Sequence, residues 1–287
     1  MLWKRCRLLI NEKSNGKVKA MTYLMPNIAP DRIKVKPRPY GITMMLDRCQ
    51  GLKATEDLIH MAGEYLDQIK LSFGTAVMLS EAFLRDKIDL VVDNQIDIYP
   101  GGTLMEIAFQ QRNDTQYIDW VKNCGFTTIE ISDGIYKVNR QKRDDSIKRS
   151  RGYGLKVMTE VGKKNPEIEI PISQLCDDIN ADLESGADKV IIEGRESGIN
   201  IGIYDKNGII LEDKVEAILD GVGHRQNDII WEAPRQHQQA SLIIRCGSNV
   251  NLGNILPRDV LGLEALRRGL RYETLSHFAP ELKAENE

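Results

Sequence analysis

The chain has 287 residues, of which 41% are hydrophobic and 28% charged, and its 39 basic and 42 acidic residues give a formal net charge of −3. This composition excludes a largely disordered chain, and the charge balance provides no global field that would attract nucleic acid or an anionic membrane. The five cysteines are scattered and form no Cys-x-x-Cys pair, which favours reduced thiols in a cytoplasmic protein.

Residues 1–40 are predicted to be an N-terminal extension and lead-in. The first ten residues are basic and then briefly apolar, but the polar segment 11–17 interrupts them too early for a secretory signal or a membrane span. The four prolines within 26–40 predict an irregular path across the bottom of the domain that follows. We therefore expect no membrane attachment.

From Gly41 onward, short apolar strands alternate with amphipathic helical stretches. The predicted strands are 41–46, 68–71, 96–99, 128–132, 156–160, 189–193, 228–232 and 250–252. The predicted helices are 55–65, 80–93, 117–124, 140–152, 172–185, 212–219, 236–246 and 257–270. Eight such units at a spacing of about 30 residues predict an α/β fold of the (β/α)8 TIM-barrel type, with an open doubly wound sheet as the alternative. The single barrel domain is expected over 41–275, with a tail over 276–287.

The most informative stretch is the predicted strand 189–193 with the turn that follows it. Val190, Ile191 and Ile192 are a β-branched run of the kind found in parallel strands that are buried on both faces. A buried strand that ends in a charged turn is where α/β proteins place their chemistry. Side-chain alternation puts Glu193 and Arg195 on the same face. One of them can then reach a metal ion and the other an anionic substrate.

Polar or ionisable residues follow every predicted strand. In (β/α)8 enzymes the catalytic groups come from the carboxyl ends of several strands. The candidates here are Asp47 and Arg48, Lys70, Gly102 and Thr103, Glu130 and Asp133, Glu160, Lys163 and Lys164, Glu193, Arg195 and Ser197, Glu232, and Asn251. We expect these side chains to meet at one mouth of the barrel.

Three of these candidates, Glu130, Glu160 and Glu193, lie on three successive predicted strands and suggest a metal site. Hard oxygen ligands of this kind suit Mg²⁺, which shares its coordination shell with water and an anionic substrate. We predict that these three glutamates bind Mg²⁺, with Asp133 and Glu232 as alternatives. Arginine grips oxyanions through a planar fork and lysine acts as a point charge, so the basic candidates predict an anionic ligand.

Each motif also has an ordinary structural explanation. A lone strand-end glutamate is commonly an ion-pair partner, Gly101-Gly102 alone marks a tight turn, and Lys163-Lys164 alone is a solvated loop pair. The four histidines have no partner at metal-ligand spacing, and the chain has no Ser-His-Asp arrangement, P-loop or GxGxxG motif. Aromatic and basic residues are not interleaved, so no nucleic-acid partner is expected. Function is favoured because many strand ends carry such groups at once.

Several motifs resemble those of the phosphosulfolactate synthase family and stand in the same order. They are PGGTL at 100–104, EISDG at 130–134, TEVGKK at 159–164, VIIEGRESG at 190–198, EAP at 232–234, VNLGNI at 250–255 and LEALRRGLR at 263–271. The resemblance implies a Mg²⁺-dependent barrel enzyme that adds sulfite to phosphoenolpyruvate and forms phosphosulfolactate. In methanogens this reaction opens a route to coenzyme M; bacterial relatives are associated with sulfolactate and plant relatives with heat stress.

The resemblance also implies a sequence of steps. Sulfite attacks the methylene carbon of phosphoenolpyruvate, and the charge that moves into the substrate carboxylate is stabilised by Mg²⁺. A lysine then protonates the carbon that bears the phosphate. Lys163 is the predicted proton donor, with Lys70 as the alternative, Arg195 is predicted to hold sulfite or phosphate, and Asp133 completes the catalytic set. The predicted substrate-binding residues are Asp47, Arg48, Gly102, Thr103, Lys164, Ser197, Glu232 and Asn251.

One position departs from the family pattern. The first strand of the family usually ends in Asp-Lys-Gly, whereas this chain has Asp47-Arg48-Cys49. Arginine keeps the positive charge but not the geometry of lysine or its readiness to donate a proton. Two alternatives therefore stay open: a same-fold enzyme for another phosphorylated, enolate-forming substrate, and a non-catalytic stress-associated homologue. The resemblance also predicts a homo-oligomer.

Overall fold

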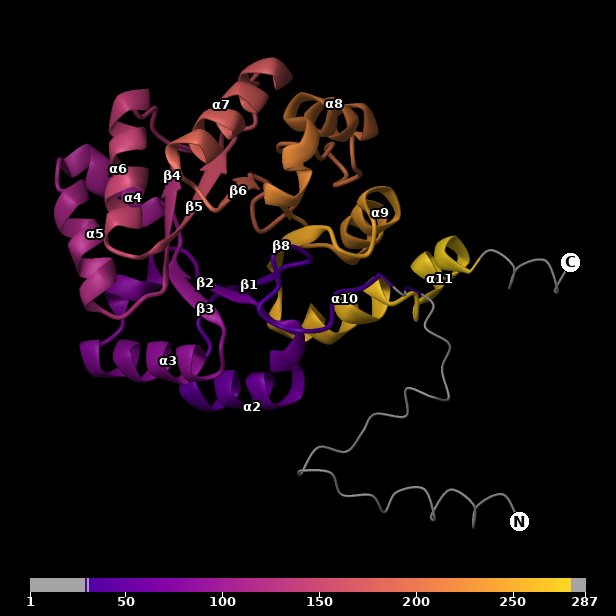
Figure 1. The fold of residues 1–287 in the computed structure, drawn as a ribbon, viewed down its shortest axis with the longest axis horizontal. Coiled ribbons are helices and arrows are strands. Elements are labelled where there is room, and N and C mark those ends of the chain that lie inside the picture. The colour runs from indigo at the N-terminus through magenta and orange to yellow at the C-terminus, as the bar shows by residue number, and fades with distance from the viewer. Residues whose placement is uncertain (1–28, 30, 280–287) are drawn as a thin grey trace, which may run out of the picture.

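The fold is a ring of parallel strands surrounded by helices, as the computed structural model shows for residue 29 and residues 31–279 (Figure 1). Eight strands form one sheet in the order β3-β2-β1-β8-β7-β6-β5-β4. Their bounds are β1 (Thr43–Asp47), β2 (Gln68–Leu71), β3 (Asp97–Pro100), β4 (Thr128–Ser132), β5 (Lys156–Val161), β6 (Lys189–Ile192), β7 (Ile229–Glu232) and β8 (Asn251–Ile255). The predicted (β/α)8 barrel is confirmed, and the doubly wound alternative is wrong.

The helices pack around the outside of the strands (Figure 1). Their bounds are α2 (Leu52–Ala62), α3 (Glu81–Asp93), α4 (Thr103–Gln111), α5 (Asp114–Asn123), α6 (Arg140–Gly152), α7 (Ile172–Ser185), α8 (Glu212–Val222), α9 (Gln236–Cys246), α10 (Val260–Arg267) and α11 (Tyr272–Phe278). Ser80 and Asn139 are the N-cap residues of α3 and α6, and their side-chain oxygens accept hydrogen bonds from first-turn amides. None of the helices in the described ranges is long and apolar enough to cross a bilayer.

Two helical regions differ from the prediction. The sequence pattern predicted one helix over 117–124 after the third strand, but the chain forms α4 and α5, which meet at Arg112 in a left-handed conformation with φ of 58°. The predicted helix 257–270 is a short 3-10 turn followed by α10. The chain then continues into α11, so the predicted domain boundary at 275 falls inside a helix. Of the predicted extension and lead-in over 1–40, residues 1–28 and residue 30 lie outside the described residues.

The barrel interior is filled by one apolar layer. Met44, Tyr99, Met158, Ile191 and Ile230 form a separate cluster, and each is at most 2% exposed. Their neighbours along the strands point the other way and pack beneath the helices in the main hydrophobic core. The next inward position on each strand, two residues further on, therefore lies just above this apolar layer. That is where the polar residues of the mouth begin.

The barrel is not fully closed by its backbone. β3 and β4, both within the described residues, share no strand pairing, whereas every other neighbouring pair does. Side chains bridge this seam instead: Ile98 N donates to Thr127 Oγ1 at 3.1 Å, and Gly102 N donates to Glu130 Oε1 at 2.7 Å. One of the predicted site glutamates thus also helps to hold the two ends of the sheet together.

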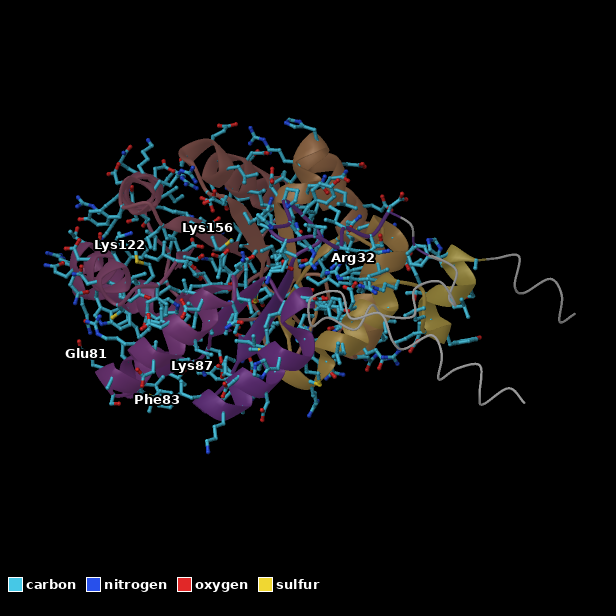
Figure 2. All side chains as sticks on the ribbon, turned by 60° about the horizontal axis from the view of Figure 1, so that its bottom comes forward. Arg32, Glu81, Phe83, Lys87, Lys122 and Lys156 are labelled. Carbon is cyan, nitrogen blue, oxygen red and sulfur yellow. The ribbon has the colours of Figure 1, made fainter. Side chains whose placement is uncertain are left out.

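The described part of the lead-in lies at the amino-terminal end of the strands. Arg32 donates to Glu264 Oε2 at 2.9 Å, and Figure 2 labels it beside the C-terminal elements. Arg38 donates to Asp67 Oδ1 at 2.6 Å. Arg267 donates to the carbonyls of Ser248, Val250 and Ile42, which holds β1 and β8 together at this end. Lead-in and barrel are therefore joined by buried arginines.

Candidate active site

Four glutamates and one lysine form a buried layer above the apolar interior. Glu160, Glu193 and Glu232 each stand two residues beyond an inward apolar residue, namely Met158, Ile191 and Ile230. The other members are Glu130 and Lys70, and all five are at most 7% exposed. Period-2 alternation in parallel strands is what aims all of them at the same axis.

Lys70 lies at the centre of three carboxylates. Its Nζ is 3.0 Å from Glu130 Oε2, 3.0 Å from Glu160 Oε2 and 3.2 Å from Glu232 Oε1. Burial alone would lower the pKa of Lys70, but the three negative charges outweigh it and hold that pKa well above its usual range. The Lys70 ammonium donates hydrogen bonds to Glu160 and Glu232 and forms an ion pair with Glu130, so carboxylates surround it. Its role in the layer is to balance charge.

Lys164 contacts only two carboxylates and lies at the entrance. Its Nζ is 2.6 Å from Glu193 Oε2, and it also donates to Glu160 Oε1. Burial opposes the charged form, but Glu160 and Glu193 raise the pKa of Lys164 and keep it protonated. Its side chain is 27% exposed. One of its three N–H groups therefore has no partner among the described side chains and is available to a ligand.

The layer carries more negative than positive charge. Four glutamates face two lysines, so two negative charges are left over if every carboxyl is ionised. Burial raises the pKa of Glu130 to about 7. Burial, together with the nearby charges of Glu160 and Glu232, raises the pKa of Glu193 well above its usual range. Such a cluster favours the arrival of further positive charge.

A cavity of about 420 Å³ opens above this layer. Its lining residues are Leu46, Lys70, Ser72, Phe73, Gly101, Gly102, Thr103, Glu130, Ile135, Glu160, Lys164, Glu193, Arg195, Glu196, Glu232 and Asn254. We call this cavity the mouth. Gly102 is required here, because a Cβ atom would come within 2.6 Å of Ser132 Cβ and 2.7 Å of Glu130 Oε1. The cavity lies at the carboxyl ends of the strands, where the sequence predicted it.

The position of Arg195 at the rim depends on two residues with an unusual backbone conformation. Arg195 and Asn254 both have positive φ, 55° and 56°, which is uncommon for residues with a side chain. Asn254 Nδ2 donates to the carbonyl oxygen of Arg195 at 3.1 Å. The strained turn places the exposed guanidinium over the mouth, within 3.5 Å of the carbonyl oxygen of Lys164. Arg195 is thus the cation at the rim that is not enclosed by carboxylates.

The structure brings most of the predicted residues together. Those that line the mouth are Lys70, Gly102, Thr103, Glu130, Glu160, Lys164, Glu193, Arg195 and Glu232. The others lie elsewhere, and they are Asp47, Arg48, Asp133, Lys163, Ser197 and Asn251.

Side-chain alternation along the strands turns Asp47, Asp133 and Lys163 away from the barrel axis. Asp47 faces outward, where its carboxylate lies 2.5 Å from Lys87 Nζ on the helix α3 (Figure 2). Lys163 Nζ donates to the Asp133 carbonyl oxygen at 2.5 Å and lies 3.3 Å from Asp133 Oδ2. Lys163 lines a separate neighbouring cavity of about 530 Å³ between α7 and α8. Lys164, one residue further on, is the lysine that reaches the mouth.

Arg48, Ser197 and Asn251 also lie outside the mouth. The Arg48 guanidinium lies over the ring of Phe73, 5.2 Å from its centroid, so it stands behind a residue that lines the mouth. The Ser197 carbonyl oxygen accepts from Arg235 Nε at 2.8 Å. Asn251 lies at the start of β8 and donates to the carbonyl oxygens of Asn227 and Ile229.

The structure adds residues that the sequence did not single out. Ser132 Oγ lies 3.0 Å from Glu160 Oε1 inside the mouth wall. Asn254 lines the mouth, and its Oδ1 is buried with no hydrogen-bond partner among the described residues. The alternation of β4 could have predicted Ser132, since it stands two residues after Glu130. A β-bulge between β1 and β8 shifts the register near Asn254, so simple alternation along the strand does not give the orientation of its side chain.

The fold and this cluster define a (β/α)8-barrel protein with an acidic, lysine-bearing site at the carboxyl ends of its strands. Residues 31–273 match the family described as (2R)-phospho-3-sulfolactate synthase, ComA. The chain is 40% identical over 236 residues to the phosphosulfolactate synthase of Methanocaldococcus jannaschii, which covers 82% of this chain and 93% of that protein. For the phosphosulfolactate synthase of Bacillus subtilis the identity is 33% over 245 residues, covering 83% and 94%. The chain therefore belongs to the phosphosulfolactate synthase family.

A more distant likeness concerns the fold alone. A crystal structure of phosphonopyruvate hydrolase matches with a TM-score of 0.51 at 13% identity, covering 86% of this chain and 92% of that chain. At this identity the match supports the barrel and its strand order, and carries nothing about the ligands of the mouth.

The mouth can be tested for its fit to the expected Mg²⁺. Over residues 29 and 31–279, no three His, Cys, Asp or Glu side chains form a ready-made metal centre. Lys70 and Lys164 stand between the carboxylates. The donor set nevertheless fits. The ligands are hard carboxylate oxygens, and when every carboxyl is ionised the two surplus negative charges of the layer balance the two positive charges of one Mg²⁺ ion. Mg²⁺ commonly binds through few protein carboxylates and completes its shell with water and substrate.

Proposed function

We propose that this chain adds sulfite to phosphoenolpyruvate and forms phosphosulfolactate. The single observation that supports this most is the buried layer of four glutamates around Lys70 and Lys164, found in a chain of the phosphosulfolactate synthase family. Both substrates are anions, and Arg195 and Lys164 supply positive charge where they would enter. The free cysteines Cys49, Cys124, Cys176 and Cys246 fit a reducing, cytoplasmic location.

Mg²⁺ is proposed to bind Glu130, Glu160 and Glu193, as the sequence indicated. When bound, it would supply Lewis-acid stabilisation of the charge that develops on the substrate carboxylate. The protein side of this arrangement is rigid: Glu130 Oε1 accepts from Gly102 N at 2.7 Å, and Glu193 Oε1 accepts from Arg195 N at 2.8 Å. Fixed carboxylates of this kind need little reorganisation when charge arrives.

Arg195 is proposed to hold the phosphate or the sulfite. Its guanidinium lies at the rim, and its planar fork suits a tetrahedral oxyanion. Gly102 supports the same site through its lack of a side chain. Its N–H is already used by Glu130, so it contributes space for a close approach rather than an amide for the anion. Thr103 lines the mouth beside it at the start of α4.

Lys164 is proposed to deliver the proton. Sulfite forms a C–S bond at the methylene carbon, and the electrons of the double bond move toward the substrate carboxylate. Lys164 Nζ then gives a proton to the carbon that bears the phosphate and becomes a neutral amine. Its raised pKa keeps it protonated beforehand, and its partner-free N–H is the one that can point at substrate. Lys163 is held by Asp133 outside the mouth, so geometry favours Lys164 over it.

The test is direct synthesis. Purified protein is incubated with phosphoenolpyruvate, sulfite and Mg²⁺, and phosphosulfolactate is detected by mass spectrometry, with a reaction without sulfite as control. Product from the wild type and none from Glu160→Gln would support the proposal. No product, together with retained Mg²⁺-dependent binding of phosphoenolpyruvate, would overturn it and favour a different second substrate. The homo-oligomer implied by the resemblance is checked on the same sample by light scattering.

A further inference from the structure

Glu106 is a buried carboxylate that the proposed mechanism does not use. It lies on α4, is 0% exposed, and stands at the seam where β3 and β4 do not pair. Its Oε2 accepts from Ile135 N at 2.7 Å and from Tyr136 N at 3.0 Å. Its Oε1 lies 3.0 Å from Ser132 Oγ. No lysine or arginine within the described residues forms an ion pair with it.

A buried charge that is met only by backbone amides and a hydroxyl must be well placed to be tolerated. All three of these donors belong to one short segment, residues 132–136, which runs from the last residue of β4 into the loop after it. We call residues 133–136 the β4 loop. Glu106 reaches this loop across the open seam, so it fastens the loop to α4 where no strand pairing can do so. Without it, the two partly buried amides of Ile135 and Tyr136 would lose their acceptor.

The β4 loop bears directly on the mouth. Ile135 lines the cavity. Gly134 accepts a hydrogen bond at its carbonyl oxygen from Lys164 N at 3.0 Å. A Cβ atom on Gly134 would stand 3.0 Å from Lys164 Nζ, so the loop lies against the lysine along its length. The position of the β4 loop therefore constrains the position of the Lys164 ammonium.

Ser132 provides a second connection to the same lysine. Its Oγ is 3.0 Å from both Glu106 Oε1 and Glu160 Oε1, and a hydroxyl has only one proton to donate. Glu160 Oε1 in turn accepts from Lys164. Glu106 is therefore connected to Lys164 by two indirect routes, one through the β4 loop and the other through the Ser132 hydroxyl and Glu160.

We infer that Glu106 is a positioning residue for proton transfer by Lys164 and for closure of the mouth over the phosphorylated substrate. The inference rests on the proposed function. Glu106 touches no substrate; it holds the β4 loop, and the loop holds Lys164 and covers the mouth with Ile135. Loss of this clamp moves the lysine and opens the mouth, so it changes substrate affinity as well as turnover.

The experiment compares Glu106→Ala with Glu106→Gln. The amide oxygen of glutamine can accept from both loop amides and its NH₂ can donate to Ser132 Oγ, so Glu106→Gln should stay within about threefold of the wild type. Glu106→Ala should lower kcat/KM for phosphoenolpyruvate by about 100-fold, with KM raised at least about fivefold, since a small misplacement of a reacting group is costly. A purely structural role would lower the active fraction and leave KM unchanged, which would overturn the inference.

Asp205→Ala is the matched control. The Asp205 carboxylate also accepts from two backbone amides, those of Asn207 and Ile209, in a loop outside the mouth. Its loss should leave the KM for phosphoenolpyruvate within about twofold, in line with an exposed loop contact. An equal rise of KM in this variant would contradict a specific clamp at Glu106.

Hydrogen exchange separates this inference from the proposed function. The amides of Ile135 and Tyr136 should exchange at least about tenfold faster in Glu106→Ala and at the wild-type rate in Glu106→Gln. Hydrogen exchange is measured without turnover, so it tests the contact of Glu106 with the β4 loop even if no phosphosulfolactate forms. Unchanged exchange in Glu106→Ala would overturn the clamp. If that variant does not fold, Glu106→Asp withdraws the carboxylate by one methylene, and unchanged exchange and KM there would overturn it equally.

Discussion

The two ends of this barrel bury charge in opposite ways. At the amino-terminal end of the strands, Arg32, Arg38 and Arg267 outnumber the carboxylates that they meet, and each of them also donates to backbone carbonyls. At the mouth, four glutamates outnumber Lys70 and Lys164. Surplus arginine donors can be satisfied by the chain itself, because carbonyl oxygens are always at hand. Surplus carboxylates in the mouth can be satisfied only by protons, a metal ion or a ligand.

This difference separates a stabilising end from a reactive one. In (β/α)8 barrels the chemistry lies at the carboxyl ends of the strands and the other end serves stability. Here the separation is visible in the charge balance of each end. Substitutions at the two ends should therefore have different consequences.

Lys70→Met should have the largest effect. It removes the one cation that three buried carboxylates share, and breaking a buried ion pair costs about 3–5 kcal/mol. We expect the free energy of unfolding, measured by urea denaturation, to fall by about 4 kcal/mol, and product formation to be lost. A stable Lys70→Met protein with normal activity would show that the layer does not depend on this charge.

Arg32→Met breaks the corresponding pair at the other end. Arg32 and Glu264 are buried and joined at 2.9 Å, so the free energy of unfolding should fall by about 3 kcal/mol. Activity per folded molecule should not change, because the pair lies at the far end of the barrel from the mouth. Urea denaturation and an assay at a temperature where the variant is folded check both halves. A large drop in kcat would contradict the separation of the two ends.

Mg²⁺ should act on the mouth alone. With Mg²⁺ at ten times its dissociation constant, we expect the free energy of unfolding to rise by about 1.4 kcal/mol in the wild type. Arg32→Met should show the same increment, and Glu160→Gln a smaller one, since it loses a proposed ligand. Thermal unfolding with Mg²⁺ and with EDTA measures this. An equal increment in Glu160→Gln would remove Glu160 from the proposed metal site.

The pH dependence of the Glu264 pair should be the smallest effect. Burial alone would raise the pKa of Glu264, but Arg32 outweighs it and holds that pKa below its usual range. A lowered carboxyl pKa stabilises the fold above the unfolded value, near pH 4.3, and this stabilisation is lost as the pH falls through the folded value. The stability gap between the wild type and Glu264→Gln, measured by urea denaturation, should therefore narrow below about pH 4.3. A gap that widens in acid would contradict this assignment.

Much of the fold could be predicted from the sequence, because buried parallel strands are apolar runs that end in polar turns. All eight strands lie close to their predicted bounds. The helix α4 was missed, because the sequence pattern predicted a helix only over 117–124, which falls on α5. The open seam between β3 and β4 could not be predicted either, because it depends on how eight twisted strands close around one axis.

The site was predictable as far as alternation was applied. It correctly places Glu193 on the inward face, and the same count along β5 runs from Met158 and Glu160 to Lys164, not to Lys163. It also turns Asp47 outward to Lys87. Glu106 had no such signal, because its loop partners are almost thirty residues away along the chain and meet it only through the folded seam.

The most direct test of the account compares the two adjacent lysines. Lys163→Ala and Lys164→Ala are assayed for phosphosulfolactate formation with Mg²⁺, and phosphoenolpyruvate binding is measured by calorimetry. Loss of a general acid typically costs 10²–10⁴ in rate, so Lys164→Ala should lower kcat by about 10³-fold and still bind phosphoenolpyruvate. Lys163→Ala should keep kcat within about threefold, as expected for a residue outside the site. The reverse order, with Lys163→Ala inactive and Lys164→Ala active, would contradict the account.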